Sequence, residues 1–232
     1  MNAIHRRYAL AAAVTVSALA PVSAAIAAAP AAAATLSADK PCYVNADPSS
    51  GAPMTLTGSG YIPGDTVDIS GGGVFTTALV QPDTTFVATT PAPILSTIGP
   101  GAMKTTLTAT DENNAGSATT PPTATAVVHS ANLAVSTSPG SVRNVRKDKV
   151  TFRFSGFAPH KNIFGYYMRK KIVAKVRFGK ASGPCGTLRQ RALLYPGGRP
   201  RYDRYTVTFE SRGRYAKRAF PRVTGKLSIL HF

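Results

Sequence analysis

The sequence predicts an all-β protein in which two consecutive β-sandwich domains follow a signal peptide. Two observations lead to this fold class. The short phrase Ser-Gly-aromatic-x-Pro begins at Ser59 and again at Ser155, 96 residues later, and this period is about the size of one β-sandwich. The chain also holds 20 Gly and 18 Pro, lacks Trp and is rich in Thr, Val and Ser, which favours short strands with tight turns over helices.

The first 34 residues (1–34) have the layout of a secretory signal peptide. A basic start at 5–7 precedes an apolar run over 9–20, and the Ala-rich stretch up to Ala34 offers cleavage sites flanked by small residues. The alternative is a membrane anchor, but prolines interrupt the stretch and Ala dominates it. No later segment is long and apolar enough to span a bilayer. We therefore expect a mature protein that is secreted, extracellular or held at the cell wall.

The first β-sandwich is expected over residues 35–129. Alternation of apolar and polar residues marks half-buried strands, and these are expected at 54–57, 66–70, 74–75, 84–87 and 103–110. A last strand is expected between 115 and 128, followed by a linker near 129–131.

The second β-sandwich is expected over residues 130–232. Its predicted strands lie at 133–135, 149–154, 163–168, 172–178, 205–209 and 226–230. Two of them form a hairpin whose turn is Arg169-Lys170-Lys171. Because side chains alternate along a strand, Tyr205, Val207 and Phe209 are expected to face the core. By the same rule Thr206, Thr208 and Glu210 are expected to face outward.

The repeated phrase has a structural explanation. Gly60 and Gly156 end their strands at positions where the backbone needs a positive φ, and the aromatic residue that follows covers the core. The proline two residues further on fixes the turn. The phrase therefore predicts two equivalent turns and no binding or catalytic motif.

The phrase resembles the strand–turn–strand of bacterial immunoglobulin-like domains, and the mature chain looks like secreted tandem-domain proteins of actinobacterial type. Residues 39–43 (Asp-Lys-Pro-Cys-Tyr), 182–186 (Ser-Gly-Pro-Cys-Gly) and the two repeats carry the resemblance. It implies an immunoglobulin-like fold outside the cytoplasm and supplies no catalytic residues. The Gly-Ser-Gly-x-x-x-Gly turn at 58–64 is also similar to small β-sandwich chromoproteins that carry an enediyne, which implies a small-ligand carrier as one alternative.

Charge is divided between the two expected domains. Residues 35–130 carry two basic and seven acidic residues, a net charge of −5. Residues 131–232 carry 23 Lys and Arg against Asp148, Asp203 and Glu210, a net charge of +20. This exceeds what solubility requires, and self-repulsion at such density lowers stability. The sequence therefore predicts an anionic partner, whereas a solvated surface with lysine-protected edge strands is the simpler alternative.

The cations expected to contact this partner lie on the hairpin and in a later loop. Arginine predominates there, and its guanidinium suits two-point contact with phosphate, sulfate or carboxylate. The candidate polyanion-binding residues are Arg169, Lys170, Lys171, Lys175, Arg177, Arg212, Arg214 and Arg218. The candidate partners are a cell-wall phosphate polymer, an acidic polysaccharide, nucleic acid and anionic lipid.

The two cysteines, Cys42 and Cys185, fall in different expected domains. In an oxidising compartment, two cysteines in a secreted chain indicate one disulfide, which here would link the domains. Two buried free thiols are the alternative, because the sequence does not give the geometry.

The sequence contains no recognisable catalytic motif. The three histidines after the signal, His129, His160 and His231, have no metal-ligand spacing, and the common nucleophile, phosphate-binding and zinc motifs are missing. We expect no catalytic residue, no metal and no cofactor. The predicted function is a secreted non-catalytic protein whose basic domain binds an anionic polymer of the cell envelope. The alternative is a structural or adhesive protein whose acidic and basic domains associate, within or between chains.

Overall fold

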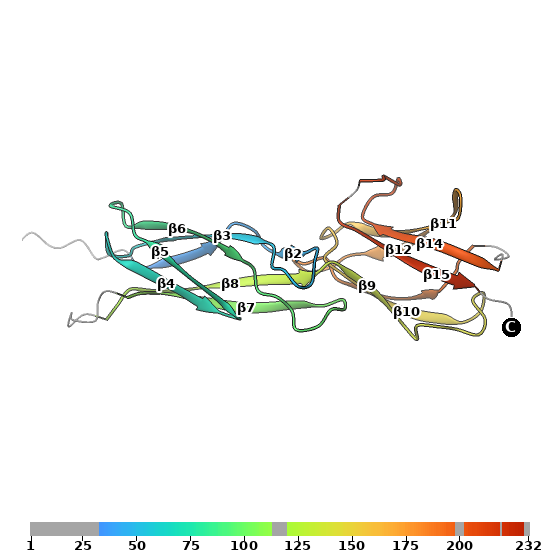
Figure 1. Cartoon of the computed structure of the whole chain (residues 1–232), viewed down its shortest axis with the longest axis horizontal. Coiled ribbons are helices and arrows are strands. Elements are labelled where there is room, and N and C mark those ends of the chain that lie inside the picture. Colours follow the sequence, from blue (N-terminus) through green and yellow to red (C-terminus); the bar gives the residue numbers. More distant parts are fainter. Residues whose placement is uncertain (1–32, 113–119, 198–201, 219, 230–232) are drawn as a thin grey trace, which may run out of the picture. The chain divides into compact units, whose positions relative to one another are not determined.

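The computed structural model describes residues 33–112, 120–197, 202–218 and 220–229 (Figure 1). In these ranges the chain forms fifteen strands and no helix, which confirms the all-β prediction. No helix of the described part is therefore long and apolar enough to cross a membrane. The predicted signal peptide lies outside the described residues except for Ala33 and Ala34.

The N-terminal half (residues 35–132) consists of two sheets packed around one hydrophobic core. The three-stranded sheet has the order β1 (Thr35–Ala38), β3 (Pro53–Ser59), β6 (Thr85–Pro91). The five-stranded sheet has the order β2 (Tyr43–Asn45), β8 (Thr123–Asn132), β7 (Ala102–Asp111), β4 (Thr66–Gly71), β5 (Val74–Leu79). Buried residues alternate with more exposed ones along most of these strands, and Leu56 and Phe86 from the first sheet share one core with Ile69 and Leu107 from the second.

The C-terminal half (residues 134–229) repeats this plan around a second core. Its three-stranded sheet has the order β13 (Leu188–Leu193), β10 (Lys149–Ser155), β9 (Ala134–Ser138). Its four-stranded sheet has the order β12 (Ile172–Lys180), β11 (Asn162–Met168), β14 (Asp203–Glu210), β15 (Arg222–Ile229). Phe152, Phe154, Phe178 and Phe209 fill the space between the sheets, with ring centroids 4.6–6.1 Å apart.

The repeated phrase marks the same corner in both halves. After β3 and after β10, the chain leaves the three-stranded sheet and enters the opposite sheet as β4 or β11. Gly60 has φ 82° and Gly156 has φ 77°, and the aromatic residues that follow, Tyr61 and Phe157, are buried against the core. The structural explanation of the phrase therefore agrees with the backbone and the burial.

The expected linker at 129–131 is wrong. These residues belong to β8, which continues to Asn132, and only Leu133 separates β8 from β9. The strand is extended because β2 pairs with it in parallel, Tyr43 beside Ser130, and this covers the end of β8. Residues 32–232 form one compact unit, so the division into two domains stays a prediction.

Three strands have no counterpart among the predicted ones. The strands β1 and β2, of four and three residues, are too short to show a period, and β13 carries two arginines in six residues. All three lie at sheet edges, where a strand needs only one hydrogen-bonded neighbour.

Candidate functional site

The turn of the β11–β12 hairpin exposes three of the candidate cations, Arg169, Lys170 and Lys171. Arg169 is already paired, because its guanidinium forms a salt bridge with Asp203 and its Nε donates to Oδ2 at 2.6 Å. The backbone N–H of Arg204 and then Arg169 hold the pKa of Asp203 below its ordinary value. Lys170 and Lys171 are therefore the more available cations of the turn.

Lys175 and Arg177 lie on the outer face of the four-stranded sheet, as alternation along β12 predicts. The Lys175 ammonium lies 4.9 Å from the ring centroid of Phe164 and donates to the carbonyl of Gly213. The Nε of Arg177 donates to Asn162 Oδ1 at 3.0 Å. Both head groups thus have protein partners, which fixes their positions on the sheet.

Residues 211–218, which we call the basic loop, fold back over the same outer face. The hydroxyl of Tyr166 donates to the carbonyl of Arg212 at 2.8 Å, and the Tyr166 and Tyr215 rings meet edge to face at 5.6 Å. Arg222 donates to the Tyr215 hydroxyl at 2.7 Å. The loop is therefore anchored through Tyr215, while its basic side chains remain exposed: Arg212, Arg214, Lys217 and Arg218.

The prediction that Glu210 and Thr208 are exposed is wrong. They do lie on the outer face of β14, but each is 0% exposed, because the basic loop covers Glu210 and the Thr208 hydroxyl lies 3.3 Å from the Thr224 hydroxyl on β15. Glu210 lies opposite Arg222 in the β14–β15 register, and its Oε1 accepts the Ala216 N–H at 3.3 Å. Burial raises the pKa of Glu210, and the nearby Arg222 offsets part of this rise. The alternation of side chains along β14 predicted the correct face of the sheet, but it could not predict that the basic loop lies over that face.

Replacing Glu210 with glutamine is expected to change how stability depends on pH. Because the folded pKa of Glu210 is raised, its contribution to stability is complete below the unfolded pKa and is lost as pH rises through the folded pKa. Glu210→Gln should therefore gain stability relative to the wild type as pH rises from 4 to 7. Urea unfolding at several pH values measures this difference.

Asp203→Asn provides the control, because the folded pKa of Asp203 is lowered and its contribution has the opposite sign. This variant should lose stability relative to the wild type as pH rises over its own titration. A Glu210→Gln profile parallel to that of Asp203→Asn would contradict the burial of an ionisable Glu210.

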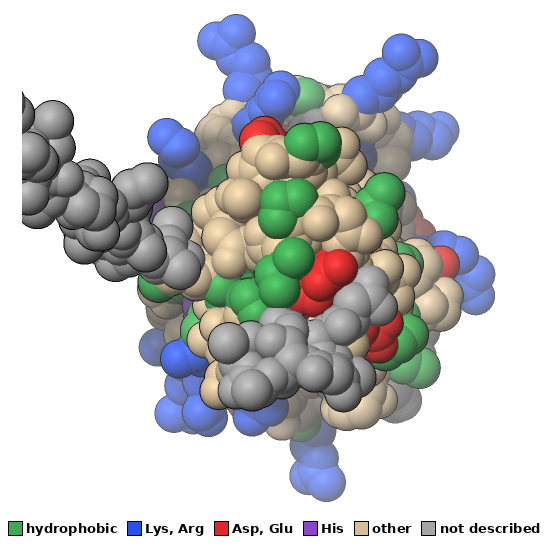
Figure 2. All heavy atoms as spheres, turned by 90° about the vertical axis from the view of Figure 1, so that its left-hand side faces the viewer, with side chains coloured by type: hydrophobic (Ala, Val, Ile, Leu, Met, Phe, Trp, Pro, Cys, Tyr) green, Lys and Arg blue, Asp and Glu red, His purple; other side chains and the backbone are tan. Residues whose placement is uncertain are grey.

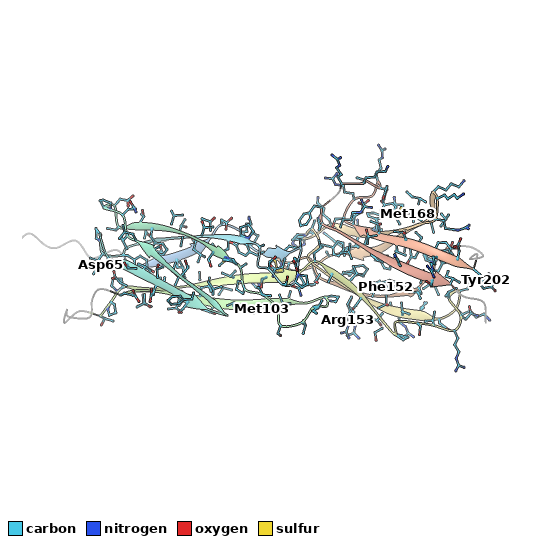
Figure 3. All side chains as sticks on the ribbon, in the orientation of Figure 1. Asp65, Met103, Phe152, Arg153, Met168 and Tyr202 are labelled. Carbon is cyan, nitrogen blue, oxygen red and sulfur yellow. A yellow bond between two sulfur atoms is a disulfide. The ribbon has the colours of Figure 1, made fainter. Side chains whose placement is uncertain are left out.

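A further group of cations, not singled out in the sequence, lies on the outer face of the sheet β13-β10-β9. We call it the arginine face: Lys149, Arg153, Arg189 and Arg191, all exposed. Arg153 lies directly opposite Arg189 in the register of β10 and β13. Figure 3 shows Phe152 between the two sheets and its neighbour Arg153 on the outer side. Arg189 and Arg191 are two positions apart, so a strand here places both on one face, and this spacing was the signal that could have revealed the arginine face.

The acidic residues of the C-terminal half leave these cations uncompensated. Asp148 accepts the Asn144 N–H at 2.8 Å, Asp203 pairs with Arg169, and Glu210 is buried under the basic loop. Among the described residues, the structure shows two salt bridges, Lys40–Asp39 and Arg169–Asp203. The exposed cations of the basic loop and the arginine face therefore have no ion-pair partner in the described chain.

Cys42 and Cys185 are joined in a disulfide that connects the two halves. Cys185 is buried, and its carbonyl accepts the N–H of Gly156 at 3.0 Å, which ties the bridge to the second repeated phrase. Beside it, the Ser155 hydroxyl donates to the Asn132 carbonyl at 2.6 Å and accepts from the Gly101 N–H at 3.0 Å. Covalent and polar contacts thus fix the passage from β8 to β9.

The described surface has two hollows, which are relevant to the alternative that the protein carries a small ligand. An open cavity of about 720 Å³ lies between the β9–β10 loop and β15, and its cations are Arg143, Arg146 and Lys226. A hollow of about 420 Å³ lies on the outer face of β1-β3-β6, and most of its lining residues are Thr and Ser. No cluster of three or more His, Cys, Asp or Glu in the described ranges could hold a metal ion.

Acidic residues gather at one end of the N-terminal half. The register places the β3–β4 and β5–β6 connections beside the end of β7, and Asp65, Asp83 and Glu112 lie in or next to these segments. Figure 2 looks onto this end and shows acidic side chains beside hydrophobic ones. A side-chain hydrogen bond with Asp68 raises the pKa of Glu112. This end is thus an acidic surface opposite in sign to the C-terminal half.

These features define a class, an all-β protein of paired sheets with a strongly basic C-terminal half. No protein family matches the chain, and no curated protein matches it. Similar solved structures include the tetra-tandem repeat from the extending region of a large adhesion protein, at 14% identity and TM-score 0.29. It is matched over 85% of this chain and 49% of that one.

Two further solved structures are adhesins. One is from a 1.5-MDa bacterial ice-binding adhesin and concerns its retention on the host cell surface. It is 14% identical with a TM-score of 0.34, and the match covers 85% of this chain and 63% of that chain. The other is a Ca²⁺-stabilized adhesin that helps an Antarctic bacterium reach out and bind ice. It is 13% identical with a TM-score of 0.34, and the match covers 87% of this chain and 48% of that chain. This chain therefore spans about half to two thirds of their lengths, and likenesses this distant carry no functional argument.

Proposed function

We propose that this protein is a secreted, non-catalytic binding protein whose C-terminal half holds an anionic polymer of the cell envelope. One observation carries the proposal. All three acidic residues of this half are engaged or buried, while cations are exposed on the outer faces of both of its sheets. A surface of this kind attracts a polyanion and gains stability when the polyanion neutralises it.

The residue types favour phosphate, sulfate or carboxylate groups as the anions. Arginine presents five donors in a planar fork that can contact two oxygens of one anionic group. The basic loop contributes Arg212, Arg214 and Arg218, and the hairpin contributes Lys170 and Lys171. Lys175 and Arg177, on strand β12 of the four-stranded sheet, are the remaining candidate cations.

The affinity for such a polymer is expected to fall steeply with salt. Each neutralised phosphate releases counterions, so the logarithm of affinity falls with the logarithm of salt by about 0.9 per contact on duplex DNA. The complete mature chain would be titrated with a phosphate polymer between about 50 and 400 mM salt, a range over which the Debye length shortens to about one third of its starting value. Neutral dextran serves as the control polymer. Binding that is absent, or that does not respond to salt, would remove the proposal.

The acidic end of the N-terminal half favours a second candidate function, association between copies of the chain. Asp65, Asp83 and Glu112 of one copy would meet the basic C-terminal half of another, as in a structural or adhesive protein. Sedimentation at low salt without polymer measures this association. Salt-dependent self-association would support the second candidate, and a single monomeric species would exclude it.

A further inference from the structure

We propose that the arginine face is the primary contact surface for the polymer, and that this polymer is a linear phosphodiester chain without nucleobases. The inference rests on the proposed function and names the site and the ligand class. The face comprises Lys149, Arg153, Arg189 and Arg191, on two neighbouring antiparallel strands.

The register sets the spacing of the cations. Arg153 on β10 lies directly opposite Arg189 on β13, and Arg191 lies opposite Thr151. Directly opposite Cβ atoms are about 5 Å apart, and residues i and i+2 on one strand are about 7 Å apart. The strands therefore present a compact array of positive charges on a sheet face.

This arrangement costs stability in the absence of an anion. Like charges directly opposite each other on neighbouring strands are destabilising. No acidic residue lies on β9, β10 or β13, and the nearby Asp148 carboxylate already accepts the Asn144 N–H. The repulsion is relieved when an external anion lies between the guanidinium groups.

The arginine face differs from the hairpin cations Arg169, Lys175 and Arg177 in having unengaged head groups. Arg169 is paired with Asp203, Lys175 donates to a carbonyl, and Arg177 donates to Asn162. Within the described residues, no hydrogen bond or salt bridge holds the head group of Arg153 or Arg189. Their donors are thus available to a ligand without breaking an existing contact.

The neighbouring side chains indicate the ligand class. Hydroxyl groups flank the arginines, since Ser136 and Ser138 on β9 lie opposite Arg153 and Thr151. No aromatic residue lies on this outer face, so it offers no platform on which nucleobases could stack. Cations about 5–7 Å apart match a backbone with closely repeated phosphates better than a polysaccharide with widely spaced carboxylates.

The test compares two variants of the full mature chain that lose the same charge. One is Arg153→Gln/Arg189→Gln/Arg191→Gln, and the matched control is Lys161→Gln/Lys180→Gln/Arg204→Gln, three exposed cations outside the arginine face, the hairpin turn and the basic loop. Affinity for poly(glycerol phosphate) is measured by calorimetry at several salt concentrations. The arginine-face variant should lose at least about tenfold in affinity and about two to three phosphate contacts from the salt slope. The control should lose less than about threefold.

Each remaining outcome is decisive. Equal losses in both variants would overturn the arginine face and leave general polyanion binding intact. No binding by the wild type would remove the proposed function itself. Tighter binding of duplex or single-stranded DNA than of poly(glycerol phosphate) would overturn the ligand class.

Two further measurements separate binding from folding and from net charge. The arginine-face variant should unfold at the same or a higher urea concentration than the wild type, because it removes like-charge repulsion. The charge-preserving variant Arg153→Lys/Arg189→Lys/Arg191→Lys should bind between the wild type and the glutamine variant, since lysine lacks the guanidinium fork. Full wild-type affinity in the lysine variant would contradict two-point contact by arginine.

Discussion

Replacing Cys42 and Cys185 together with serine is expected to lower the free energy of unfolding by up to about 5 kcal/mol. The bridge joins residues 143 positions apart, and a cross-link that closes so long a loop removes much conformational freedom from the unfolded chain. Serine is similar in size to cysteine, so the folded packing around the buried Cys185 changes little. Urea unfolding of wild type and variant measures the difference.

Reduced wild-type protein is the control for the serine substitutions. It should unfold at the same urea concentration as the double variant if the loss comes from the bridge. The non-reduced wild type should contain no free thiol, in agreement with the structure. Identical unfolding of oxidised and reduced protein would show that the bridge does not contribute to stability.

Gly186→Ala should destabilise the protein by about 4 kcal/mol or more, a loss that few single substitutions reach. Gly186 has φ 55°, and a Cβ added there would lie 1.7 Å from the carbonyl oxygen of Phe157. The obstacle is backbone, and Gly186 also accepts the Phe157 N–H, so the second repeated phrase would have to move. Thermal unfolding checks this expectation.

Gly183→Ala is the matched control in the same loop. Gly183 also has a positive φ, of 67°, but nothing lies within 4 Å of an added Cβ. This variant should lose only the roughly 1–2 kcal/mol that a left-handed backbone costs a residue with a side chain. Equal losses in the two variants would mean that strain, and not the contact with Phe157, determines the cost at Gly186.

The repeated phrase was the most reliable guide to the fold. Its glycine and aromatic residue meet local requirements, a positive φ and a ring over the core, that do not depend on distant parts of the chain. The position of the junction was not predictable in the same way. His129, Ser130 and Ala131 have linker-like composition, but pairing with the short strand β2 makes them the end of β8.

The candidate site shows the same contrast between local and long-range effects. Alternation correctly placed Lys175 and Arg177 on an outer face, because it depends only on strand geometry. It could not show that the basic loop covers Glu210, since this contact comes from a segment with no periodicity. Nor could it show that Arg153 lies opposite Arg189, because register is a property of two strands.

The bridge between Cys42 and Cys185 also determines how the chain would carry a pulling force. When the two ends are stretched, the shortest covalent path crosses the sulfur atoms and bypasses the residues between them. Most strands of both halves lie within this bypassed stretch. At 3.3–3.6 Å per extended residue, a separation of 143 positions corresponds to roughly 500 Å of contour length that tension cannot draw out while the bridge is intact.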